Sequence, residues 1–212
     1  MAGQWDGVTL RTTFKEHITA RRDAVADAAH AGDWDTLLAA LRTHPDLVNS
    51  WRLGGSSWFT PLHQAAWHNA PLEVARALLA HEPWLSLPDA AGDTPCDIAL
   101  RNGNHALAEL LTPVFRHPAP TQALRPHLHA VILERVAPEV AEHRLRLPEV
   151  SIIAEQRDPR IGFPIPGMYG GFTLRLDGDT LVSESWSRVV GGSGQRHVIT
   201  AAGAELVESG FV

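Results

Sequence analysis

The residues of this chain that could carry out chemistry lie mostly in its last fifty positions. Glu184 and His197 could transfer protons, and Arg188 and Arg196 could hold a negative charge. A carboxylate and an imidazole that lie close together can have their pKa values shifted apart by burial and by neighbouring arginines, as acid–base chemistry requires. Such a set predicts proton transfer, isomerisation, cyclisation or water addition rather than redox or phosphoryl-transfer chemistry.

Two aromatic residues and two glycine-rich segments accompany these groups. Tyr169 could donate a hydrogen bond, and Trp186 could exclude water. Residues 167–171 and 191–194 are expected to be neighbours at one end of a hairpin. Successive glycine N–H groups can form a nest for a small anion, although glycines also serve tight turns. These segments are therefore a candidate site for a small anionic ligand.

The sequence contains no motif for a covalent nucleophile or a metal ion. Neither Gly-x-Ser-x-Gly nor His-Glu-x-x-His occurs, and Cys96 is the single cysteine. His127 and His129 are two positions apart, so they cannot share one helical face as metal ligands normally do. We therefore expect a protein without a metal or another cofactor.

The elements that must position these residues are strands. From about residue 144 the hydrophobic period changes from 3.6 to 2, which predicts a small antiparallel sheet. We expect strands over residues 150–154, 172–177, 181–190, 195–200 and 205–208, with a turn-rich loop over residues 164–171. After Thr121, apolar residues at helical spacing predict one helix packed on this sheet: Leu124, Leu128, Val131, Ile132 and Val136.

The turns decide which side chains share a face. A two-residue turn around Gly178 and a four-residue turn at residues 191–194 would place Arg188 directly across from His197. The face toward the helix would carry Phe172, Leu174, Leu176, Leu181, Ser183, Ser185, Ser187, Val189 and Val198. The opposite face would carry Arg175, Glu184, Trp186, Arg188, His197 and Ile199. That second face is either a solvated or docking surface or the wall of a polar pocket.

The first half of the chain contains a repeat of 34 residues. The letters TPLHQAA at 60–66, followed by an apolar helix, return as TPCDIAL at 94–100. A third, degenerate copy over residues 28–41 lacks the Thr-Pro opening. The pattern resembles the ankyrin repeat, over about residues 13–112. The resemblance implies a stack of helix pairs that binds another protein, and an inhibitory or immunity-like role by occlusion is one form of this.

The resemblance also implies roles for single residues. His63 corresponds to a structural histidine of the ankyrin repeat. Trp67, His68 and Arg101 occupy variable positions that line the concave surface in the family, so they are the candidate contact patch. Trp58 flanks the finger segment between two repeats. It either packs on neighbouring helices or contacts a partner, since Trp is enriched at interface hot spots.

Composition bounds the remaining possibilities. A chain of 212 residues with 44% hydrophobic content can form one large or two small domains. Its net charge of −6, with acids and bases interspersed, argues against nonspecific nucleic-acid binding. One cysteine fits a reducing compartment, and neither a leader pattern nor a long apolar run is present, so we expect a cytoplasmic protein without a membrane segment. The excess of Arg over Lys is typical of a GC-rich bacterial genome.

We therefore predict an α+β protein in two parts. Residues 13–112 would form a short ankyrin stack, and residues 113–212 a small α+β domain packed on it or capping it, after a loose lead-in over residues 1–12. The leading function is protein–protein interaction. The alternative is a small cofactor-independent enzyme or ligand-binding protein that uses the polar pocket. Residues 113–212 are not expected to fold well alone, because Trp186 and Ile199 need cover.

Overall fold

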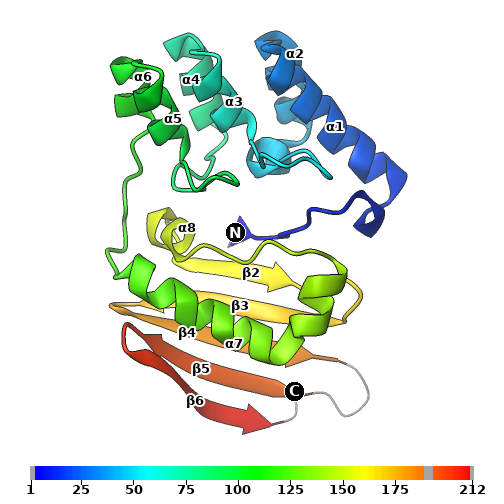
Figure 1. Cartoon of the computed structure of the whole chain (residues 1–212), viewed down its shortest axis with the longest axis vertical. Coiled ribbons are helices and arrows are strands. Elements are labelled where there is room, and N and C mark those ends of the chain that lie inside the picture. Colours follow the sequence, from blue (N-terminus) through cyan, green and yellow to red (C-terminus); the bar gives the residue numbers. More distant parts are fainter. Residues whose placement is uncertain (1–2, 189–192, 211–212) are drawn as a thin grey trace. The chain divides into compact units, whose positions relative to one another are not determined.

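The computed structural model describes residues 3–188 and 193–210 of an α+β protein (Figure 1). The chain divides into two compact units. The helical unit is Thr9–Pro113, and the sheet unit combines Met1–Val8 with Val114–Val212. Among the described residues, no helix is long and apolar enough to cross a membrane.

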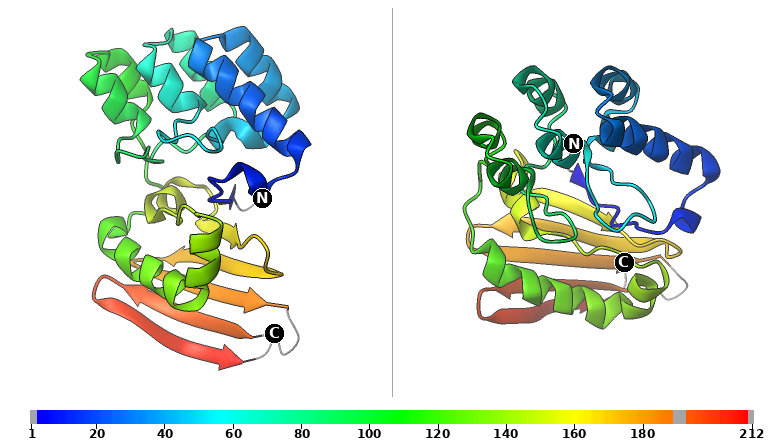
Figure 2. Two further views of the ribbon diagram at one scale, coloured as in Figure 1. Left: turned by 45° about the vertical axis from the view of Figure 1, so that its right-hand side comes forward. Right: turned by 45° about the horizontal axis from the view of Figure 1, so that its top comes forward.

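The helical unit consists of three antiparallel helix pairs. The first helices of the pairs, α1, α3 and α5, lie side by side in one layer, and α2, α4 and α6 form the second layer (Figures 1 and 2). The elements are a 3₁₀ turn at Arg11–Thr13, α1 Glu16–Ala31, α2 Trp34–Thr43, a 3₁₀ turn at Pro45–Asn49, α3 Pro61–Trp67, α4 Leu72–Leu79, α5 Pro95–Arg101 and α6 His105–Leu110.

The starts of α3 and α5 follow from the repeated Thr-Pro pair. Thr60 and Thr94 are the N-caps, and each is followed by proline at the first helical position, where a missing N–H costs nothing. The Thr60 N–H donates to Nδ1 of His63 over 3.3 Å, and the Thr94 N–H donates to Oδ2 of Asp97 over 2.9 Å. The carboxylate that replaces histidine in the second copy thus performs the same capping function.

The ends of the first helices share one backbone conformation. Gly32, Asn69 and Gly103 follow α1, α3 and α5 at equivalent positions, with φ values of 70°, 51° and 73°. Glycine adopts positive φ freely, and asparagine is among the few other residues that tolerate it. The unusual Asn69 turn therefore keeps the geometry of the other two. Leucine, isoleucine and alanine side chains close the core of the unit: Leu37, Leu41, Leu62, Ala65, Leu78, Ile98 and Leu107.

The sheet unit contains a six-stranded sheet in the order β1 to β6. All neighbouring strands are antiparallel except β1 and β2, which are parallel. Helix α7 lies across β4, β5 and β6, and α8 contacts α7 and β3. The elements are β1 Gly3–Gln4, α7 Thr121–Glu142, α8 Val150–Glu155, β2 Arg160–Pro164, β3 Gly170–Asp177, β4 Thr180–Ser187, β5 Gly194–Thr200 and β6 Gly203–Gly210.

Helix α7 is the predicted helix, and all five of its predicted apolar contacts are buried. It begins at Thr121 as its first residue, with Pro120 as the N-cap. Its backbone breaks at Val136, where φ is −139°, two residues before Pro138. Proline lacks the N–H that a regular helix requires at this point, which accounts for the kink.

The first strand of the sheet unit was predicted at the wrong place. Residues 150–154 form helix α8, not a strand, and Val150, Ile152, Ile153 and Ala154 are all fully buried. A short apolar run that is buried on all sides carries no periodicity that separates helix from strand. The strand that begins the antiparallel part of the sheet is β2 instead, which ends at Pro164, the first residue of the stretch predicted as a loop.

The first residues are also not a loose lead-in. Strand β1 pairs with β2, and the Trp5 N–H donates to the Gly162 carbonyl over 2.8 Å. The Trp5 side chain is 1% exposed, and its Nε1–H donates to the Arg146 carbonyl over 2.7 Å. The Arg146 guanidinium lies 5.3 Å from the Trp5 ring centroid. Residues 3–5 thus complete the edge of the sheet unit.

Candidate functional site

Strand pairing decides which of the predicted polar residues meet. The β3–β4 hairpin has a two-residue turn, as predicted, with Leu176 opposite Leu181 and Leu174 opposite Ser183. The β4–β5 register differs, because Trp186 pairs with Gly194, whereas the predicted four-residue turn would have placed Trp186 across from Ile199. The shift is odd-numbered, so it moves every side chain of β5 to the other face.

This shift separates the two predicted proton-transfer groups. His197 lies opposite Ser183 on the face that packs on α7, whereas Glu184 lies on the other face, opposite Arg196. His197 is therefore not across from Arg188, and the predicted pairing of Glu184 with His197 is wrong. Ile199, predicted on the open side, is fully buried on the helix face, and Val198, predicted on the helix face, lies on the opposite face.

His197 has charged neighbours on α7. Its burial lowers the pKa of the imidazole, Glu134 opposes this change, and Arg135 adds to it. Burial also lowers the pKa of Arg135, whose Nη2 donates to both the carbonyl and the hydroxyl oxygen of Ser193 over 2.8 Å. These groups help to hold α7 on β5.

The face of the sheet opposite α7, here called the open face, carries three rows of side chains across the strands. The arginine row is Arg160, Arg175, Val182, Val198 and Glu205. The ion-pair row is Gly162, Thr173, Glu184, Arg196 and Glu208. The tryptophan row is Pro164, Gly171, Trp186, Gly194 and Gly210.

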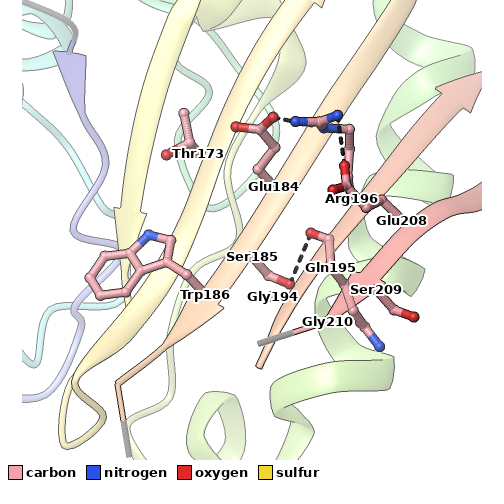
Figure 3. Close-up of a pocket in the computed structure, with 10 residues that line it drawn as sticks. All are labelled: Thr173, Glu184, Ser185, Trp186, Gly194, Gln195, Arg196, Glu208, Ser209 and Gly210. Carbon is pink, nitrogen blue, oxygen red and sulfur yellow. Dashed lines mark hydrogen bonds and ion pairs between the residues drawn. The ribbon is translucent and has the colours of Figure 1, made fainter. Parts of the chain in front are cut away.

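Two hollows lie on the open face. In the ion-pair row, Arg196 Nε donates to Glu184 over 2.9 Å, and Nη1 lies 2.8 Å from a carboxylate oxygen of Glu208 (Figure 3). A hollow of about 350 Å³ adjoins these three residues and Trp186. A second hollow of about 260 Å³ is lined by Arg160, Thr173, Arg175, Val182 and Glu184. Thr173 and Glu184 line both, so the two hollows are neighbours.

The predicted glycine-rich segments meet in part. The Arg188 N–H donates to the Tyr169 carbonyl over 2.8 Å, which places residue 169 beside the end of β4. The Tyr169 side chain is 79% exposed, and the Arg188 guanidinium lies 5.5 Å from the Trp186 ring centroid. Val189, Gly191 and Gly192 lie outside the described residues.

In the helical unit, Trp67 is the last residue of α3, and 56% of it is exposed. The Phe59 ring meets its indole edge to face at 6.0 Å and stacks on His63 at 5.5 Å. Arg101, at the equivalent end of α5, pairs with Asp93 over 2.7 Å. We call Phe59, Trp67, His68 and Arg101 the Trp67 patch.

Hydrogen bonds between equivalent positions connect the repeats beneath this patch. His68 Nε2 donates to the His30 carbonyl over 2.9 Å, and Asn102 Nδ2 donates to the Trp67 carbonyl over 3.2 Å. His68 also meets the Trp34 ring at 5.9 Å. His68 therefore holds the layer of first helices together. Asn102 occupies the position in its repeat that His68 occupies in the preceding one. This equivalence was the signal in the sequence that could have identified Asn102 as a residue that connects two repeats.

Two further predicted residues are placed by the structure. His63 is fully buried, and its Nδ1 lies 2.8 Å from the Thr60 hydroxyl oxygen, so it is structural as predicted. Trp58 is partly buried and has a positive φ of 57°, which is unusual for a residue other than glycine. It directly precedes Phe59, in the segment that places the Phe59 ring against α3.

Comparison with known families agrees with this geometry. Residues 57–89, which span α3 and α4, match the family model described as Ankyrin repeat. The chain carries an ankyrin repeat. No curated protein matches the chain. The helix pairs α1–α2 and α5–α6 flank the matched repeat and share its turn geometry and its inter-repeat hydrogen bonds.

Proposed function

We propose that the protein binds another protein through the Trp67 patch of its helical unit. Ankyrin repeats generally mediate protein–protein binding, and residues 57–89 match this repeat. The observation that carries the proposal is the exposure of Trp67. Its neighbours Leu62, Ala65 and Ala66 on α3 are at most 1% exposed, whereas more than half of Trp67 is accessible.

The patch has the physical features of an interface hot spot. Tryptophan and arginine are the residues most often found to dominate interface energies, because a large or planar side chain can be fully desolvated by a partner. Phe59 supports the Trp67 indole, so part of its conformational entropy is lost before binding. Arg101 is held by Asp93, yet its side chain remains 55% exposed and can reach a partner.

The form of activity that we propose is inhibition by occlusion, which includes immunity-like neutralisation of an enzyme. A patch with an aromatic centre and an ion-paired rim can cover a partner's site without reacting with it. The single cysteine, Cys96, is half-buried with Sγ 3.4 Å from the Ala108 carbonyl, and it fits a reducing compartment. We therefore propose a cytoplasmic partner.

Binding measurements with a Trp67→Ala variant test the proposal. The partner that copurifies with the wild-type chain would be purified and titrated against both forms by calorimetry. We expect the variant to lose about 2 kcal/mol or more, a roughly 30-fold rise in Kd.

The matched control is Leu133→Ala, which removes an apolar side chain that is 41% exposed on α7 in the sheet unit. Its Kd should equal that of the wild type. An unchanged Kd for Trp67→Ala, with circular dichroism showing an intact fold, would remove the Trp67 patch from the interface.

A further inference from the structure

The larger hollow on the open face exists because glycines replace side chains beside Trp186. Gly194 and Gly210 continue the tryptophan row toward β6, and both line this hollow. A Cβ added at Gly210 would meet no atom within 4 Å, so the space above it is open. In Figure 3 the indole lies on the β3 side of the hollow, and Glu208 lies on the β6 side. A flat group can therefore lie beside the indole.

In the smaller hollow two arginines, Arg160 and Arg175, face one carboxylate, that of Glu184. Arg160 and Arg175 are direct cross-strand partners, and like charges in this arrangement destabilise a sheet. Arg175 lies 3.3 Å from an oxygen of Asp177, which is itself largely exposed. Within residues 3–188 and 193–210, Arg160 has no ion-pair partner. An anion held between the two guanidinium groups would relieve the repulsion, and arginine binds carboxylate and phosphate in a bidentate manner.

Between the hollows lie groups that suit hydroxyls rather than further negative charge. Glu184 lines both hollows, and its carboxylate can accept hydrogen bonds from hydroxyl groups. Arg196 offsets its charge through the 2.9 Å hydrogen bond. The Thr173 hydroxyl lies on the same row and can donate or accept. A ligand that crosses this row should therefore be a neutral polyol at its middle.

The spacing of the rows sets the length of the ligand. Val182 in the arginine row and Trp186 in the tryptophan row are both on β4, with Glu184 midway between them. At about 3.3 Å per residue, the two rows lie roughly 13 Å apart. The two neighbouring hollows form one groove along β4. It offers an oxyanion subsite at Arg160 and Arg175, then a hydroxyl subsite at Glu184 and Thr173, and then a ring subsite at Trp186.

We propose that the open face binds a nucleoside 5′-diphosphate. The diphosphate lies between Arg160 and Arg175, the ribose hydroxyls contact Glu184 and Thr173, and the base stacks on Trp186. Stacking of a base on an aromatic side chain tolerates every base, so the groove selects the class of ligand and not one base. The Arg188 guanidinium, in cation–π contact with Trp186, fixes the indole. This site lies in the sheet unit and the Trp67 patch in the helical unit, and the proposal does not depend on the function proposed for that patch.

The test uses the full chain and four probes: adenosine 5′-diphosphate, guanosine 5′-diphosphate, adenosine and inorganic phosphate. The indole N–H signals of the seven tryptophans are recorded by NMR, and the signal missing from a Trp186→Phe variant identifies Trp186. We expect both diphosphates to shift the Trp186 signal and to bind more tightly than adenosine or phosphate alone. The Trp67 signal should not move.

Charge variants complete the test. In calorimetry, Arg160→Gln combined with Arg175→Gln should weaken diphosphate binding at least about tenfold, whereas Arg116→Gln, at an exposed arginine outside the groove, should leave it unchanged. Both substitutions lie at surface positions, so the fold should persist, and the unshifted indole spectrum checks this. The proposal is overturned if the diphosphates leave the Trp186 signal in place. It is also overturned if they bind the double variant as tightly as the wild type, or if phosphate alone binds as tightly as the diphosphates.

Discussion

The two tryptophan sites of this protein, at Trp67 and Trp186, are held in place by contacts of different range. Trp67 in the helical unit is positioned by Phe59 and by its own helix, all within one repeat. Trp186 in the sheet unit is positioned by pairing with Gly171 on β3 and Gly194 on β5, across two turns of the chain. A site built from local contacts depends on one helix and its cap, whereas a site built from strand pairing depends on the register of the whole sheet.

Among the variants proposed here, replacement of Trp5 should have the largest effect on stability, and it should act on the sheet unit. Trp5→Ala removes a fully buried indole and its hydrogen bond to Arg146, and should lower the free energy of unfolding of the sheet unit by about 3–5 kcal/mol. Hydrogen exchange resolved by segment would show faster exchange in β2 and β3, with α3 to α6 unchanged. The same loss explains why a fragment that begins at residue 113 should fold poorly.

Trp67→Ala is the matched control for this prediction, because Trp67 is exposed and its removal should change stability by no more than about 0.5 kcal/mol. Equal acceleration of exchange in both units after Trp5→Ala would show that the N-terminal strand does not stabilise the sheet unit specifically.

A smaller effect is expected in the helical unit, where stability depends on local caps. Thr94→Ala removes the acceptor of the Asp97 N–H and should cost about 1 kcal/mol, measured by chemical denaturation. Asp97→Ala removes the reciprocal bond to the Thr94 N–H. Because both residues form one capping box, the double variant should cost less than the sum of the single variants. If the stability losses of the two single variants add up to that of the double variant, the two residues do not act as one capping box.

The smallest expected effect distinguishes the units by pH. Burial lowers the pKa of His197 in the folded sheet unit, so the unfolded chain binds its proton more readily. The contribution of His197 to stability is present above its ordinary pKa, near 6.5, and is lost as the pH falls through the lowered value. In the helical unit, the hydrogen bond from Arg11 lowers the pKa of Asp23, so its contribution persists until the pH falls below about 4.

Unfolding curves from pH 7.5 to 4.5 would measure this difference. The sheet unit should lose stability over this range in the wild type and lose less in His197→Gln, and the helical unit should change little. A slope that His197→Gln leaves unaltered would show that other histidines cause it.

The same difference in range explains what the sequence could predict. Local signals predicted the helices correctly, and they predicted a structural role for His63. These signals are the Thr-Pro openings, the residues with positive φ after the first helices, and the apolar face of α7. The face of β5 depended on the length of the connection after Trp186, which no local pattern defines, so His197 and Ile199 were assigned to the wrong face. Helix α8 and the place of Trp5 depended on burial by distant residues.

Site-specific photo-crosslinking would show directly whether a partner protein covers the Trp67 patch. A photoreactive phenylalanine analogue would replace Trp67 in one form of the chain and Leu133 in another, and each form would be irradiated with the partner. The proposed function predicts a covalent adduct from position 67 and none from position 133. An adduct from position 133 with none from position 67 would contradict it.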